Sequence, residues 1–173
     1  MQQVEPNPAH RAIAQVQDRV PKLTLITQNV DGLHERAGSR DVVELHGNIQ
    51  RIKCSAGCGV VDAFDQDASP PRCPKCAAWL RPDVVWFGEP LPAAALESAR
   101  HAAADCEIFF SVGTSALVFP AADLPRVARD AGALLVEINP DQTPLSALAD
   151  FALRAPAGVV LPALLRALEA AAA

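Results

Sequence analysis

The sequence predicts an α/β fold in which an open parallel sheet carries a small inserted module, and three observations support this. Helix-like and strand-like segments alternate along the chain, which is the order that produces parallel sheets. Several strand-like runs end abruptly in polar turns. Four of the five cysteines lie between positions 54 and 76. With 173 residues, of which 50% are hydrophobic, the chain is long enough to bury a core.

The first strand-like run follows a helix. Residues 6–20 carry apolar side chains at helical spacing behind two prolines, and we expect a helix there. Residues 23–27 are short, apolar and rich in strand formers. Two further extended runs, 42–45 and 49–53, lead to the first cysteine.

The second half of the chain repeats this alternation. The predicted elements are an extended segment at 80–89, a helix at 92–104, a strand at 108–112, a helix at 120–131, a strand at 134–138 and a helix at 159–171. The intervening composition shifts toward cysteine, proline and acidic residues. We therefore expect one domain formed by residues 1–50 and 81–173, with residues 51–80 inserted into it.

The cysteines are spaced as metal ligands. Three residues separate Cys54 from Cys58, fourteen separate Cys58 from Cys73, and two separate Cys73 from Cys76, which is the spacing of a zinc ribbon. Four protein thiolates leave no open coordination position, so the predicted zinc is structural. The alternative is four unligated thiols. Cys106 lies apart on an apolar approach to a strand and is expected to pack as a small hydrophobe.

Charge and composition limit the partners and the location. The net charge of −5 argues against a nucleic-acid surface, and no apolar run is long enough to cross a membrane. The first residues lack the basic and apolar regions of a signal peptide. We therefore expect a cytoplasmic protein, where clustered cysteines bind metal more readily than they form disulfides.

Polar residues follow three of the predicted strands. They are Gln28, Asn29 and Asp31 after the first strand, Gly113, Thr114 and Ser115 after a later one, and Asn139 after the last. Open α/β sheets bind their ligands at the carboxyl ends of the strands, and such a set of amides, hydroxyls and a glycine suits a nucleotide. The alternative for each is an ordinary polar turn.

One histidine fits the role of a base. His46 stands alone at a strand end beside Gly47, and imidazole is the usual general base near neutral pH. His34 has helical and charged neighbours and is interpreted as structural or surface. His10 and His101 lie in helical segments, where a surface position is the expectation.

Read in order, these motifs resemble the sirtuins, the NAD-dependent protein lysine deacylases, in a form of bacterial type. The matching segments are T-Q-N-V-D-G-L-H, E-L-H-G, the paired cysteines, V-V-W-F-G-E, V-G-T-S and E-I-N-P. The resemblance covers about residues 6–168. It implies a Rossmann-like domain with an inserted zinc ribbon, and NAD bound beside the acylated lysine of a protein substrate.

The resemblance also implies roles for individual residues. His46 corresponds to the catalytic base, which deprotonates a ribose hydroxyl after the acyl oxygen has displaced nicotinamide. The implied NAD-binding residues are Gln28, Asn29, Val30, Asp31, Gly113, Thr114, Ser115, Asn139 and Ala157, with Asn29 and Asp31 also serving catalysis. The implied substrate-binding residues are Val85, Trp86, Phe87 and Gly88, with 117–119 on the opposite side of an apolar tunnel.

Two features of the family's pattern are absent from the sequence. The Gly-Ala-Gly-x-Ser loop for the NAD phosphates has no counterpart, and without a tyrosine there is no Tyr-x-x-Arg pair for acidic acyl groups. The hypothesis is therefore that this chain binds NAD weakly and turns over slowly or not at all. The alternative is a catalytically silent, zinc-stabilised scaffold or partner-binding remnant.

Overall fold

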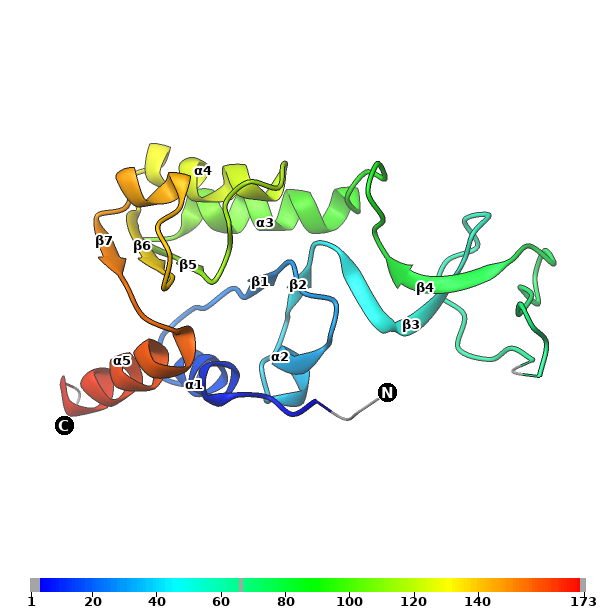
Figure 1. Ribbon diagram of the computed structural model, residues 1–173, viewed down its shortest axis with the longest axis horizontal. Helices are drawn as coiled ribbons and strands as arrows, with labels where there is room; N and C mark the ends of the chain where they lie inside the picture. The colour runs from blue at the N-terminus through cyan, green and yellow to red at the C-terminus, as the bar shows by residue number, and fades with distance from the viewer. Residues whose placement is uncertain (1–3, 66, 172–173) are drawn as a thin grey trace.

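The computed structural model of the chain describes residues 4–65 and 67–171, and Figure 1 shows the arrangement of its elements. The α-helices are α1 (Pro8–Gln17), α2 (Leu33–Arg36), α3 (Ala93–Asp105), α4 (Leu124–Asp130) and α5 (Ala157–Ala171). The strands are β1 (Ile26–Thr27), β2 (Val43–Glu44), β3 (Gly47–Cys54), β4 (Leu80–Val84), β5 (Ile108–Val112), β6 (Leu134–Ile138) and β7 (Phe151–Leu153). Two short 3-10 helices, η1 (Ala121–Asp123) and η2 (Pro144–Ala147), complete the described elements.

The predicted parallel strands are present, in two groups. β1 pairs with β2 in parallel, and β5, β6 and β7 form a second parallel sheet in that order. In the second sheet β6 is the central strand, so both of its edges are hydrogen-bonded. All these strands except β1 and β7 follow the predicted ranges closely, because short β-branched and aromatic runs favour extended backbone.

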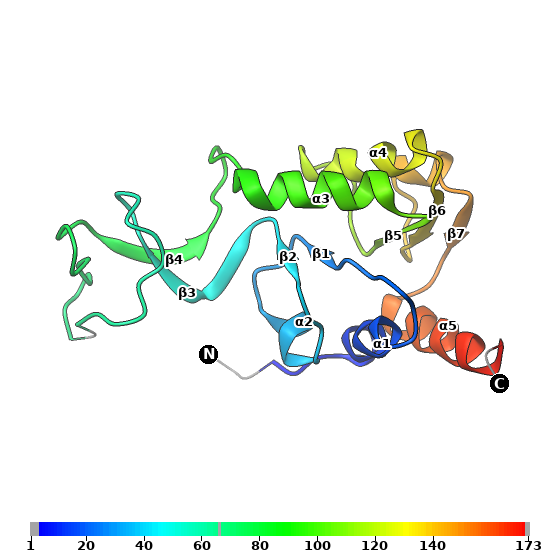
Figure 2. The same ribbon diagram turned by 180° about the vertical axis from the view of Figure 1, so that it is seen from behind.

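Helices α3 and α4 lie side by side above both parallel groups (Figures 1 and 2). Their small residues, such as Ala99, Ala103 and Ala128, are fully buried and let the helices approach the strands closely. Leu45, just beyond β2, and the partly buried Phe109 of β5 pack into this same cluster. The helix layer therefore ties the two strand groups to one core.

Helices α1 and α5 lie together on the other side of the three-stranded sheet (Figure 1). Ala12 of α1 and Leu161 and Leu165 of α5 pack with Ile138 of β6 in a second core cluster. The amino- and carboxyl-terminal helices thus cover the sheet face opposite α3 and α4. The helices cover the two faces of the sheet, and the carboxyl ends of its strands lead into loops.

The antiparallel pair β3–β4 extends away from this body as an arm (Figures 1 and 2). The arm carries residues 55–65 and 67–79 at its far end, where Val61 and Cys73 pack with Cys54 of β3 and Leu80 of β4 in a separate small cluster. Two isolated bridges, Lys53 with Val60 and Arg72 with Trp79, close the loops that bear the cysteines.

Several sequence-based expectations need adjustment. The first helix ends at Gln17 rather than near residue 20, and β1 is shorter than the predicted run 23–27. β7 was not predicted, because Phe151–Leu153 is too short a run to stand out. The surface position expected for His10 is wrong: its side chain is buried, contacts the ring of His34 at 4.6 Å and completes the cap of α1. In the described part of the chain, no helix is long and apolar enough to cross a membrane.

Candidate functional site

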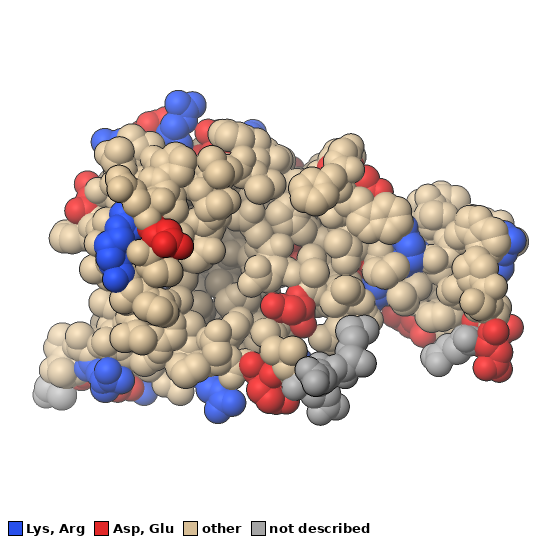
Figure 3. Space-filling model, viewed as in Figure 1, with Lys and Arg blue, Asp and Glu red and all other residues tan. Residues whose placement is uncertain are grey.

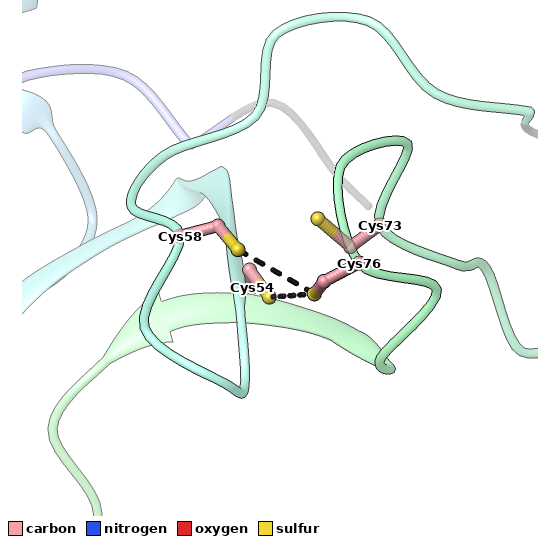
Figure 4. A group of neighbouring side chains, drawn as sticks. All are labelled: Cys54, Cys58, Cys73 and Cys76. Atoms are coloured by element: carbon pink, nitrogen blue, oxygen red, sulfur yellow. Dashed lines mark hydrogen bonds between the residues drawn. The ribbon is translucent and has the colours of Figure 1, made fainter.

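The four predicted metal ligands come together at the end of the arm (Figure 4). Cys54 and Cys58 come from the end of β3 and the turn after it, and Cys73 and Cys76 come from the loop before β4. All four sulfur atoms lie within 4.8 Å of one another. Two chain segments thus present one compact set of four thiols.

The geometry of this set fits a tetrahedral ion. The Sγ atoms of Cys76 and Cys54 are 3.5 Å apart, and those of Cys76 and Cys58 are 3.4 Å apart. Zinc–sulfur bonds of about 2.3 Å in a tetrahedron place sulfur atoms about 3.8 Å apart. The thiols therefore fit zinc with little rearrangement, and Cys54 also accepts the Ala56 N–H in the manner of a metal-binding knuckle.

The thiols affect one another strongly. The backbone N–H of Cys58 is the main cause that lowers the pKa of the Cys54 thiol to about 6. The neighbouring sulfur of Cys76 is the main cause that raises the pKa of Cys58 to about 12. Negative charge on one sulfur therefore opposes ionisation of the next, and a divalent cation is the chemical means of holding several thiolates together.

The polar residues after β1 line a small pocket. Asn29 and Asp31 lie on its wall, next to Thr27 and His34. The Asp31 carboxylate accepts the backbone N–H of Leu33 at 3.0 Å, which fixes the start of α2. Local hydrogen bonds thus set the backbone of this loop and present both an amide and a carboxylate at the strand end.

His46 lies next to this loop. Its Nδ1 is 2.9 Å from the carbonyl oxygen of Gln28, and a carbonyl only accepts, so Nδ1 carries the hydrogen. Nε2 is then the unprotonated nitrogen of the neutral ring and is able to take a proton. The carbonyl oxygen of His46 also accepts the N–H of Val85, which ties the residue to the chain beyond β4.

Gly47 makes this packing possible. Its φ of +78° is in the left-handed region, and a Cβ there would lie 2.1 Å from the carbonyl oxygen of Asp83. Only glycine combines that conformation with so close an approach of β4. The pairing of β3 with β4, and with it the place of His46, depends on this residue.

A hydrogen bond connects the carboxyl end of β5 to that of β1. The Gln28 side-chain amide donates to the Thr114 hydroxyl at 3.5 Å, across 86 positions of sequence. The Asn139 side-chain amide donates to the carbonyl oxygen of Thr114 at 2.9 Å. Gly113, with φ of +62°, donates its N–H to the carbonyl of Ile138 and so holds the loops after β5 and β6 together.

These contacts form one continuous polar chain, which we call the strand-end chain: His46, Gln28, Thr114 and Asn139. Its members follow four different strand segments, as predicted from their positions at the carboxyl ends of parallel strands. The loop following β5 borders a hollow on the face seen in Figure 3, whose walls carry mainly uncharged side chains. The arrangement offers an imidazole base, amides and hydroxyls along one edge.

Other predicted site residues lie near this chain without joining it. Val30 accepts the Ile49 N–H through its carbonyl group, and Ser115 is exposed in the turn after Thr114. Ala157 is the first residue of α5 and packs against the cluster that contains Ile138. Its contacts are therefore with this core cluster.

The predicted substrate segment forms an exposed apolar turn after β4. Trp86 and Phe87 are largely exposed, and Gly88 has φ of +87°. Arg81 of β4 holds this turn in place, because it stacks on the Trp86 ring at 4.2 Å and pairs with Glu89 at 2.7 Å. The bond from Arg81 lowers the pKa of the Glu89 carboxyl, and Glu89 in turn accepts the Trp86 N–H.

A second exposed apolar segment, Leu117 to Phe119, comes shortly after Thr114 in the sequence. The side chains of Leu117 and Phe119 are 64% and 72% exposed, so both are surface groups and not core residues. Cys106, by contrast, packs beside the core cluster under α3 as expected, and burial raises the pKa of its thiol.

Sequence reasoning missed two charged pairs. Glu137 is 1% exposed inside β6 and pairs with Arg154, and Arg81 pairs with Glu89 under the apolar turn. The signal for the first was in the sequence, because Glu137 interrupts the apolar run 134–138 where a charge is costly to bury. Its partner lies 17 positions away and no spacing rule points to it.

Comparison with known proteins agrees with this geometry. The model of the Sir2 family matches residues 1–120. An NAD-dependent protein deacylase of Methylococcus capsulatus is 51% identical over 175 residues, covering 95% of this chain and 68% of the relative. One of Ralstonia nicotianae is 52% identical over 164 residues, covering 94% and 66%. The chain thus spans about two thirds of the length of these curated relatives.

Solved structures of the same kind share the fold. A crystal structure of a Sir2 homologue in complex with NAD superposes with a TM-score of 0.91 at 42% identity, covering 99% of this chain and 68% of that one. A structure of Sir2 bound to an acetylated peptide gives a TM-score of 0.87 at 32% identity, covering 95% and 71%. On sequence and fold alike, the chain belongs to the Sir2 family, the sirtuins.

Proposed function

We propose that this chain is an NAD-dependent protein lysine deacylase that transfers the acyl group of a modified lysine to ADP-ribose and releases nicotinamide. The observation that carries the proposal is the strand-end chain, which joins a base, His46, to amide and hydroxyl groups of three other strand ends. The deacylase relatives and the structures of Sir2 homologues with NAD and with acetylated peptide support it.

In this proposal His46 accepts a proton at Nε2. The Gln28 carbonyl fixes the ring through Nδ1, so the basic nitrogen keeps one orientation. NAD supplies, when bound, a ribose whose bond to nicotinamide is cleaved and whose hydroxyl receives the acyl group. Asn29 and Asp31, which follow β1 directly, would orient the nicotinamide end with an amide and a carboxylate.

The remaining contacts to NAD are assigned by position. Gln28, Val30, Gly113, Thr114, Ser115 and Asn139 lie at or beside the carboxyl ends of the parallel strands, where nucleotides bind. Ala157 would support the adenine end from below. The weak NAD binding expected from the sequence stays a prediction, and calorimetry with the purified chain measures it.

The acylated lysine would enter between two exposed apolar segments. Residues 85–88 would pair with the substrate backbone, and Trp86 and Phe87 would cover the aliphatic lysine stem and acyl group. Leu117 to Phe119 would form the facing wall. Their exposure supports this role, because large exposed apolar groups mark binding surfaces.

We also propose that residues 51–80 form a structural zinc domain inserted into an NAD-binding domain of residues 1–50 and 81–173. The separate small core of the module and its four thiols support this division. The free thiols also support a cytoplasmic location, since oxidising compartments favour disulfides.

The test is a product analysis with the 173-residue chain, zinc, NAD and an acetyl-lysine peptide. The expected products, in equal amounts, are free lysine peptide, nicotinamide and O-acetyl-ADP-ribose, measured by mass spectrometry. An acyl-peptide panel then ranks the acyl groups. Because weak NAD binding and slow turnover are expected, the assay is run at NAD concentrations that calorimetry shows to be saturating. A folded, zinc-loaded chain that yields none of these products at saturating NAD would contradict the proposal and favour a silent scaffold.

A further inference from the structure

The buried ion pair of Glu137 and Arg154 is the feature of the molecule that the proposed chemistry does not use. Glu137 lies in the middle strand of the three-stranded sheet and is 1% exposed, between the buried Val136 and Ile138. A carboxylate in such a place is unfavourable unless charged or polar partners surround it. Its partners therefore indicate why the charge is kept.

Three side chains satisfy the Glu137 carboxylate. The Arg154 Nη1 donates to it at 2.7 Å and the Ser146 hydroxyl at 2.6 Å, and the Thr143 hydroxyl donates as well. Burial by itself would raise the pKa of Glu137, but these donors outweigh it and lower the pKa. The carboxylate is thus charged and fixed, and it contacts the polypeptide both at 143–146 and at 154.

Arg154 carries this anchor to the turn after β6. Besides Glu137, its Nη1 approaches the carbonyl oxygens of Asn139 at 3.4 Å and of Asp141 at 3.1 Å. Thr143 and Ser146, which donate to the same carboxylate, also form a capping box at the start of η2. The turn 139–143 is therefore fastened at both of its ends to one buried charge.

The fastened turn presents Asn139. Its side-chain oxygen accepts the Asp141 N–H at 3.1 Å, and its nitrogen donates to the Thr114 carbonyl at 2.9 Å. An asparagine amide has two acceptor positions and two N–H groups, so one of each remains for a ligand. Two neighbouring hydroxyls, such as those of a ribose, need a donor and an acceptor in fixed positions.

We infer that Glu137 and Arg154 are positioning residues that hold Asn139 and Thr114 in the geometry required by the adenosine half of NAD. The inference rests on the proposed function. Neither residue touches the ligand in this scheme. Their effect is transmitted by the backbone of the turn, and it should appear in the affinity for ADP-ribose and not in the chemical step.

The experiment compares Glu137→Gln and Arg154→Met with the wild-type chain. We expect each variant to bind ADP-ribose about tenfold more weakly and to raise KM for NAD about tenfold, as loss of one fixed hydrogen-bonding group does. kcat and KM for the acyl peptide should change less than about twofold. Arg126→Met, which removes the pair of the exposed Arg126 with Asp123 at the start of α4, is the matched control and should change nothing.

A second readout needs no ligand. Hydrogen exchange of the Asp141 amide, which donates to Asn139, should be slow in the wild type and at least about tenfold faster in both variants. If Glu137→Gln does not fold, Arg154→Lys keeps the charge without the planar reach to two carbonyls and should show the same pattern, more weakly.

The outcomes separate the two proposals. Unchanged ADP-ribose affinity and unchanged Asp141 exchange in folded variants would overturn the inference, as would equal losses toward NAD and peptide. Faster exchange in the variants, with no ADP-ribose binding by the wild type, would confirm the anchored turn and contradict the proposed function.

Discussion

The cysteine module and the strand-end chain differ in how the sequence assembles them. Cys54 and Cys76 meet across 22 positions, within one excursion of the chain. Gln28 and Thr114 meet across 86 positions, and their contact exists only because β1 and β5 pack under the same two helices. The first site is encoded by spacing and the second by the fold.

The two regions also differ in what holds them together. The core of the module consists of four residues, and two of these are the thiols of Cys54 and Cys73. The body has two larger clusters built on long helices. Small modules without a sufficient core depend on metals or disulfides. Metal should therefore stabilise the module, and packing should stabilise the body.

Metal removal is the strongest test of that difference. Chelation of zinc should unfold residues 55–79, since binding and folding of such modules are coupled. We expect a large change in Trp79 fluorescence together with complete loss of deacylation, because β4 positions the turn that contains Trp86. The helical circular dichroism of the body should persist.

Cys73→Ser is the matched variant for this experiment, since it removes one buried ligand and no other contact of the body. Cys106→Ser, outside the cluster, should leave zinc content at one ion per chain. Retained deacylation in a zinc-free preparation, or cooperative unfolding of the body together with the module, would show that metal and packing do not stabilise the two regions separately.

Replacement of the base tests the other region. His46→Ala should lower kcat by about 10²- to 10⁴-fold, the range of a general base. Because His46 is only partly buried and contributes little packing, the unfolding midpoint should move little. Single-turnover product formation and urea unfolding measure the two quantities on the same sample.

The control is His101→Ala, which lies exposed on α3 and should be fully active. If His46→Ala fails to fold, the histidine is a structural residue and the assignment of the base is wrong. If both variants are equally active, another group performs the proton transfer.

How much the sequence reveals follows from the same comparison. The cysteine spacing predicted which four thiols come together, because ligands within one short module need no tertiary information. The strand-end residues were predicted individually from the polar turns after apolar runs. That Asn139 contacts Thr114 follows from the parallel pairing of β5 with β6, and that Gln28 contacts Thr114 follows from the packing of β1 and β5 against one core cluster.

What the sequence concealed is equally specific. Glu137 looked like part of an apolar strand, and its partner Arg154 is set by the pairing of β6 with β7, a strand too short to predict. His10 was predicted to be a surface residue. The helix pattern does not show that its ring accepts the backbone N–H of Asn7 at the start of α1, or that it contacts the ring of His34. Both errors concern polar groups whose burial is decided by distant neighbours.

The junction between the two regions is at Gly47, and a methyl group there should disturb both. Gly47→Ala combines a left-handed backbone with a clash against Asp83, and we expect a loss of about 3 kcal/mol in unfolding free energy. Gly132→Ala has the same kind of φ with open space around it and should cost about 1 kcal/mol. Equal losses in urea unfolding would show that the close approach of β4 is unimportant.

A smaller effect, on KM for the acyl peptide, is expected from the turn after β4 that is proposed to bind the substrate. Arg81→Met releases the Trp86 turn from Glu89, and KM for the acyl peptide should rise about fivefold, because an unfastened turn must be ordered on binding. KM for NAD should stay unchanged. Arg72→Met removes an analogous stacking on Trp79 in the module, and peptide steady-state kinetics should not detect it. Equal effects of both variants would contradict a local role for Arg81.

The mildest test is pH, and it concerns the body alone. Burial is the main cause that lowers the pKa of His10 and of His34 below 6.5, and for His34 the charge of a protonated His10 adds to it. The unfolded chain therefore binds protons that the folded chain does not. The contribution of the two histidines to the free energy of unfolding is complete above pH 6.5. It falls as the pH drops through the lowered values, by at most about 1.4 kcal/mol per pH unit for each histidine.

Urea unfolding followed by helical circular dichroism should show this slope in the wild type and in His101→Gln, and a flatter one in a His10→Gln, His34→Gln double variant. An unchanged slope in the double variant would assign the acid sensitivity to carboxylates elsewhere in the body.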